Sequence, residues 1–198
     1  MDLTDLKKKI YQDLNLPSAK VRREALTSKM KALNDEGKNC LKCNGMCCTF
    51  AFNSMQMTPL ETIELCIDLE SKGRLNEETF EELRACIKEY RLDKDISIGG
   101  GKSFRRTYTC PFFKPGAKGC TISLHDKPYG CLGFNPMEVG VHEEGHCKVY
   151  VETHEQREET FLESEEKLNK FLISELGLYW EKLPIPMAIL ELTKVLGK

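Results

Sequence analysis

The densest cluster of reactive side chains in this sequence is the segment Cys40-Leu-Lys-Cys43-Asn-Gly-Met-Cys47-Cys48. A Cys-x-x-Cys pair places two sulfurs on one metal ion and leaves the backbone N–H groups between them free to point at the thiolates. Adjacent side chains on extended backbone point in opposite directions. Cys47 and Cys48 therefore serve two metal positions more easily than one, which favours a multi-metal centre over an isolated zinc knuckle.

A second group of cysteines lies later in the chain, separated by gaps the size of loops and without a Cys-x-x-Cys pair. We expect this group either to fill a second site or to complete the first site from across the fold. The metal ligands predicted from both groups are Cys40, Cys43, Cys47, Cys48, Cys110, Cys120, Cys131 and Cys147.

Three kinds of chemistry use many cysteines. Disulfides belong to oxidising compartments, and the charged N-terminal stretch MDLTDLKKKIYQDLNLP lacks the apolar core of a signal peptide, so we expect reduced thiols in the cytoplasm. Structural zinc takes four tetrahedral ligands, and only the first group has the paired spacing typical of such sites. Iron–sulfur clusters, such as the four-iron cluster, accept thiolates at irregular spacings. Spacing alone does not decide between an iron–sulfur cluster and Zn²⁺.

Two further cysteines are expected to pack in the core. Cys66 falls beside Ile63 and Ile67, and Cys86 falls beside Leu83, on the apolar stripes of predicted helices. A free cysteine behaves there as a small hydrophobic side chain.

The elements that must position the thiols are mostly helices. The clearest helix start is Thr58-Pro59-Leu60-Glu61, where Thr58 and Glu61 form a capping box and Pro59 takes the first helical position. This helix and the next are expected to form a hairpin between the two cysteine groups. Apolar periodicity predicts helices over residues 3–14, 19–34, 59–73, 77–91, 154–176 and 187–196.

Little β-structure is expected. The short candidates are residues 106–109 and 148–152, and residues 93–106, with three consecutive glycines, are predicted to form an irregular loop. The fold class predicted is mainly α, with helices packed around an irregular Cys-rich metal-binding centre and at most a small β-hairpin. The predicted organisation is an N-terminal helical extension (1–39), a Cys-cluster metal-binding domain (40–152) and C-terminal helices packed on the same core (153–198).

Composition limits the function classes. The chain has 198 residues, a formal net charge of −2, 30% charged and 40% hydrophobic residues, which suits one globular domain with a helical extension. The charge argues against a dedicated nucleic-acid binder. No apolar run reaches the ~20 residues needed to span a membrane, so we expect a cytoplasmic chain that does not act at a membrane.

The cysteine motifs resemble a known family. After the segment 40–48 come Cys110-Pro111-Phe112-Phe113, Gly119-Cys120-Thr121-Ile122, Lys127-Pro128-Tyr129-Gly130-Cys131-Leu132-Gly133-Phe134 and finally Cys147. In this order they resemble the YkgJ-like cysteine-cluster proteins, zinc- or iron-chelating proteins named for a CxxCxxCC motif, to which the cysteine cluster of flagellin lysine methylases is related. Here three residues rather than two separate Cys43 from Cys47, and Lys127 and Leu132 replace arginines of the family motif.

The resemblance implies a metal-binding protein and tilts the choice toward an iron–sulfur cluster used in redox or methyltransfer-type chemistry. The alternative is a structural zinc protein that binds a protein partner through its terminal helices. Thiolates around a metal leave excess negative charge, which neighbouring cations offset. The cations close to the cysteines in sequence are Lys42, Arg105, Arg106, Lys114, Lys118 and Lys127.

Overall fold

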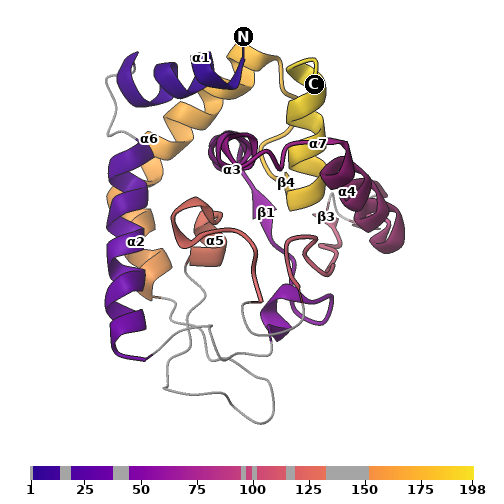
Figure 1. Ribbon diagram of the computed structural model, residues 1–198, viewed down its shortest axis with the longest axis horizontal. Helices are drawn as coiled ribbons and strands as arrows, with labels where there is room; N and C mark the ends of the chain where they lie inside the picture. The colour runs from indigo at the N-terminus through magenta and orange to yellow at the C-terminus, as the bar shows by residue number, and fades with distance from the viewer. Residues whose placement is uncertain are drawn as a thin grey trace.

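The computed structural model describes residues 2–13, 19–37, 45–94, 97–99, 102–114, 119–132 and 152–198. It is mainly helical, as predicted (Figure 1). The helices are α1 (Leu3–Lys8), the π-helical turn η1 (Lys9–Asp13), α2 (Ala19–Asp35), η2 (Met46–Cys48), α3 (Pro59–Ser71), α4 (Glu77–Tyr90), η3 (Leu124–Asp126), α5 (Tyr129–Leu132), α6 (Glu152–Leu176) and α7 (Ile185–Val195).

Helix α3 lies at the centre of the molecule, seen end-on in Figure 1, with α2 and α6 on one side and α7 on the other. The predicted capping box forms, since the side chain of Thr58 accepts from the amide of Glu61 and Glu61 accepts from the amide of Thr58. Gly73 follows the helix with a positive φ of 65°. Nearly every side chain of α3 is buried, so this helix is the core element on which the others pack.

Helices α3 and α4 do not pack on each other as the predicted hairpin: α3 packs on α1, α6 and α7, and α4 packs on α7. Helix α7 is strongly apolar and buries Ile185, Ala188, Ile189 and Leu192. A helix that is apolar over so much of its surface is buried between its neighbours. It begins two residues earlier than predicted, because a proline is tolerated in the first helical turn, where the backbone N–H has no helical partner.

Two small antiparallel pairs supply the β-structure. Strands β2 (Ser97–Gly99) and β3 (Lys102–Ser103) form a hairpin inside the predicted irregular loop. Strands β1 (Gln56–Met57) and β4 (Leu183–Pro184) join distant parts of the chain. Two-residue strands carry no alternating pattern, so the sequence could not reveal them.

Of the two strands predicted from the sequence, one does not form and the other falls mostly outside the described residues. Residues 106–109 form no strand; instead Tyr108 is buried, its backbone N–H donates to the carbonyl of Asn53 (2.9 Å), and its hydroxyl donates to the carbonyl of Met55 (2.6 Å). Of the candidate over 148–152, residues 148–151 lie outside the described residues, and Glu152 begins α6. Tyr108 thus ties the segment before Cys110 to the core.

One hydrophobic cluster takes in residues from the start, middle and end of the chain, among them Leu3, Leu26, Leu60, Leu168 and Leu192. The three predicted sections therefore share a core, while their boundaries stay a prediction. Among the described helices, none has the length and apolar character needed to cross a bilayer.

Candidate metal centre

Five of the eight predicted ligands lie in the described part of the chain: Cys47, Cys48, Cys110, Cys120 and Cys131. None of these five is in a disulfide. Cys40, Cys43 and Cys147 lie outside the described residues, as do His142 and His146, two histidines four positions apart just before Cys147 in the sequence. The described thiols come from three segments: the turn η2, the stretch from residue 110 to 120, and the short helix α5.

The turn η2 is shaped by Gly45, whose φ is +74°. A Cβ at this position would lie 2.2 Å from Cε2 of Phe113, so only glycine allows the ring this close. The backbone N–H of Cys110 donates to the carbonyl of Cys48 (2.8 Å). This hydrogen bond joins the two cysteine groups, which are far apart in sequence.

Cys110 and Cys120 lie on two antiparallel arms, residues 110–114 and 119–121, which we call the Cys110–Cys120 turn. Phe113 pairs with Cys120 in an antiparallel bridge. The amide of Lys114 donates to the carbonyl of Gly119 (2.7 Å), and the amide of Thr121 donates to the carbonyl of Phe112 (2.8 Å). The turn therefore returns Cys120 toward Cys110.

The thiols of Cys110, Cys120 and Cys131 are near enough to influence one another. Burial raises the pKa of Cys110 to about 12, and Cys120 adds to that rise. Burial first, and then Cys110 and Cys120, hold the pKa of Cys131 well above its ordinary value. Cys120 thus disfavours a thiolate at Cys110, and both disfavour a thiolate at Cys131, which is the electrostatic pattern of a site whose negative charges need a cation.

Lys127 is the predicted cation that acts on both cysteine groups. The side-chain hydrogen bond with Cys48, burial and the charge of Cys48 raise the pKa of Cys47, and the charge of Lys127 opposes this rise. Burial raises the pKa of Cys131, and Lys127 opposes that rise as well. By contrast, Lys114 pairs with Glu82 (3.2 Å) and Arg106 donates to the carbonyl of Tyr90 (3.1 Å). Lys42 and Lys118 lie outside the described residues.

The donor chemistry fits a soft metal centre. Thiolates select zinc or iron–sulfur clusters, and a bound cation removes the penalty for burying their charges. Among the described side chains alone, no three Cys, His, Asp or Glu residues form a ligand set for one ion. A full set would need cysteines from the segments that contain Cys40, Cys43 and Cys147.

Cys66 and Cys86 are buried, as predicted. Cys66 is 0% exposed in α3. Burial raises its pKa to about 12. Cys86 also donates to the carbonyl of Thr109 (3.5 Å) and adds to the rise in the pKa of Cys110. Cys86 is thus a core residue beside the candidate centre, whereas Cys66 is a core residue apart from it.

Two side chains that hold the cysteine segments could not be predicted from the sequence. Glu61 bonds to the backbone of Tyr129 at the start of α5, and Arg74 bonds to Thr121 next to Cys120. The sequence predicts Glu61 only as part of the capping box of α3. No sequence signal links either residue to its partner, because each pair is far apart along the chain.

Replacing Gly45 with alanine is expected to destabilise this region. The left-handed backbone costs an alanine about 1–2 kcal/mol, and displacement of the Phe113 ring adds roughly 1–3 kcal/mol of overpacking. Urea unfolding would measure both. Gly73→Ala is the matched control, since Gly73 has φ +65° and nothing within 4 Å of the added Cβ, so it should lose only the backbone part. Equal losses in the two variants would show that the Phe113 contact contributes nothing.

A comparison of the chain with models of known protein families, with curated proteins and with solved structures finds no match.

Proposed function

We propose that this chain is a metal-binding cysteine-cluster protein that holds an iron–sulfur cluster. The observation that carries the proposal is the convergence of the two cysteine groups: the Cys110 amide bonds to the Cys48 carbonyl, and, beyond the effect of burial, Cys120 raises the pKa of Cys110 while Cys110 and Cys120 raise the pKa of Cys131. Reduced thiols in one buried region have a physical reason to gather when a metal binds them.

The adjacent pair Cys47-Cys48 supports a centre with more than one metal position over an isolated zinc knuckle. An iron–sulfur cluster is such a centre and accepts thiolates at irregular spacings. Lys127 lies where its charge favours thiolates in both groups, and a cation beside thiolate-ligated iron raises the reduction potential. The resemblance to the YkgJ-like cysteine-cluster proteins adds support of its own.

The cluster would serve redox or methyltransfer-type chemistry in the cytoplasm, on a protein or small-molecule substrate, without a nucleic-acid or membrane partner. When bound, it would supply electron transfer or a polarising centre. The chain's own part is to supply thiolates, to place Lys127 beside them, and to surround Cys110 with buried apolar side chains such as Tyr108 and Phe112.

A second candidate is a structural zinc protein that binds another protein. Exposed aromatic rings favour it: Phe50 is 62% exposed, Phe104 61% and Phe52 51%. Phe50 and Phe52 follow η2 closely in the chain, and Phe50 stacks on Tyr90 at the end of α4 with a centroid distance of 6.5 Å. The sequence instead predicts such a surface on the terminal helices.

Metal analysis of anaerobically purified protein tests the proposal. Iron and acid-labile sulfide, with absorption near ~400 nm that dithionite bleaches, are expected for a thiolate-ligated cluster. A colourless protein with stoichiometric zinc would favour the structural candidate. Protein purified and reconstituted without either metal bound would contradict both.

Thiol alkylation before and after chelation identifies the ligands. Cysteines that hold metal should become reactive only after chelation, because a coordinated thiolate is protected from alkylation. Cys66 provides an internal control, since its buried position protects it in both states. If chelation leaves Cys110, Cys120 and Cys131 as unreactive as Cys66, they are not ligands.

A further inference from the structure

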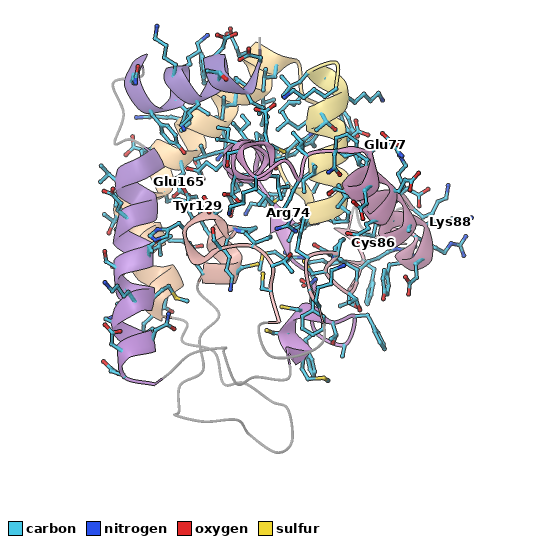
Figure 2. The ribbon with its side chains drawn as sticks, in the orientation of Figure 1. Arg74, Glu77, Cys86, Lys88, Tyr129 and Glu165 are labelled. Atoms are coloured by element: carbon cyan, nitrogen blue, oxygen red, sulfur yellow. The ribbon has the colours of Figure 1, made fainter. Side chains whose placement is uncertain are left out.

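Helix α3 contacts the cysteine-bearing segments near both of its ends. Figure 2 shows Tyr129, on α5, and Arg74, just after α3, beside the central helix. Glu61 makes the contact at the first end and Arg74 makes the contact at the second.

Glu61 uses its two carboxylate oxygens on different elements. Oε2 accepts from the backbone N–H (2.8 Å) and the hydroxyl (3.0 Å) of Thr58, which completes the capping box. Oε1 accepts from the backbone N–H of Tyr129 (2.8 Å), the first residue of α5. Glu61 is 5% exposed. A buried carboxylate thus holds the first amide of the short helix that carries Cys131, an amide with no partner inside that helix.

The side chain of Tyr129 fixes α5 a second time. Tyr129 is almost fully buried, and its hydroxyl lies 3.5 Å from Oε1 of Glu64, one helical turn after Glu61. Two carboxylates on one face of α3 therefore hold the residue that lies two positions before Cys131.

Arg74 holds the turn that carries Cys110 and Cys120. Its guanidinium donates to the carbonyl of Thr121 (2.9 Å) and to the hydroxyl of Thr121 (2.9 Å). It also lies over the ring of Phe112, 5.5 Å from the centroid. Thr121 follows Cys120 and Phe112 lies two residues after Cys110, so one side chain contacts both arms of the turn.

We infer that Glu61 and Arg74 are positioning residues that set Cys131 and the Cys110–Cys120 turn in place before a metal binds. The inference rests on the proposed metal centre. Ligand segments that are already ordered do not lose conformational entropy on binding, and outer contacts of metal ligands typically change affinity 10- to 100-fold. Helix α3, which is buried, connects the two residues and so keeps the two ligand segments at a fixed distance and orientation from each other.

Zn²⁺ affinity of the metal-free full-length chain, measured in competition with a chromogenic chelator, tests the inference through Glu61→Gln and Arg74→Lys. A Gln has one acceptor oxygen, so either Tyr129 or Thr58 loses its partner. A Lys keeps the charge but cannot make the forked bond to Thr121. We expect each variant to bind Zn²⁺ about 10- to 100-fold more weakly.

Matched controls separate positioning from general stability. Thr58→Ala removes the hydroxyl of the capping box and leaves the bond from Tyr129 to Glu61, so it should lower stability without changing Zn²⁺ affinity. Arg84→Lys alters an arginine that pairs with Glu77 on α4, and should change neither. The charge of Glu61 raises the pKa of Cys131, so neutralising it would by itself strengthen binding. Weaker Zn²⁺ binding by Glu61→Gln would therefore show that Cys131 is no longer held in position.

Unchanged Zn²⁺ affinity in both Glu61→Gln and Arg74→Lys, with wild-type protein binding Zn²⁺, would overturn the inference and leave the proposed function intact. Equal weakening in Thr58→Ala would also overturn it, since it would show a general loss of stability. Wild-type protein that binds no metal would refute the proposed function itself. If Glu61→Gln does not fold by circular dichroism, the affinity of the partly exposed Arg74→Lys decides the outcome alone.

Discussion

Cys131→Ala is expected to weaken metal binding by about 100- to 1000-fold. A structural zinc site in a small domain provides roughly 10–16 kcal/mol of apparent free energy, so one of four thiolates accounts for about 3–4 kcal/mol, or two to three orders of magnitude in affinity. Cys131 is the described thiol on which the charges of Cys110, Cys120 and Lys127 all act. The measurements are metal content after purification and Zn²⁺ affinity by competition.

Cys66→Ala is the matched control for this variant. Both cysteines have raised pKa values caused first by burial, but Cys66 lies inside α3, and among the described residues the charge that acts on its pKa is that of Lys198. Its replacement leaves a small cavity and should cost about 1–2 kcal/mol of unfolding free energy, with full metal content. Cys131→Ala should therefore lose metal, whereas Cys66→Ala should lose only stability. Loss of metal in both would show that metal content follows folding and not ligation by Cys131.

The sequence predicted the helices well because local chemistry determines their ends. The capping box of Thr58 and Glu61 forms as expected. Asn76 accepts from the amide of Thr79 at the start of α4. The apolar stripe of α6 faces the core through Leu168 and Leu172, and that of α1 does so through Leu3 and Leu6. Each of these features depends on residues a few positions apart.

What the sequence could not predict depends on partners far apart in the chain. The β1–β4 pair, the bond from Cys110 to Cys48 and the bonds of Glu61 and Arg74 to cysteine segments carry no local pattern. Closeness in sequence was also a poor guide to closeness in space. Among the cations beside cysteines, Lys114 pairs with Glu82 on α4, while Lys127 acts on Cys47, which is far from it in sequence.

Removing the metal is expected to make the cysteine segments open about 1000-fold more often, although they remain folded for most of the time, while the opening of the helical core is unchanged. The described residues of the stretches 45–53 and 108–132 form only short elements, η2, η3 and α5, joined by a few hydrogen bonds such as that from Cys110 to Cys48 and the two between Tyr108 and Asn53. Helices α3 and α7 instead share a fully buried apolar interface that includes Leu60, Ile63 and Ile189. A ligand at a thousand times its Kd stabilises what it binds by about 4.1 kcal/mol.

Amide hydrogen exchange, with and without a chelator, measures this difference directly. The amides of Cys48, Cys110 and Thr121 should lose about 1000-fold of their protection when metal is removed, while the interior amides of α3 and α7 keep theirs. Cys131→Ala should show the same exchange pattern without chelator, which links the effect to ligation and not to the chelator. An equal loss throughout α3 and α7 would mean that the core depends on the metal as well. Unchanged protection at Cys48 and Cys110 would mean that protein contacts alone hold the two cysteine groups together, and a metal would have no structural part in bringing them together.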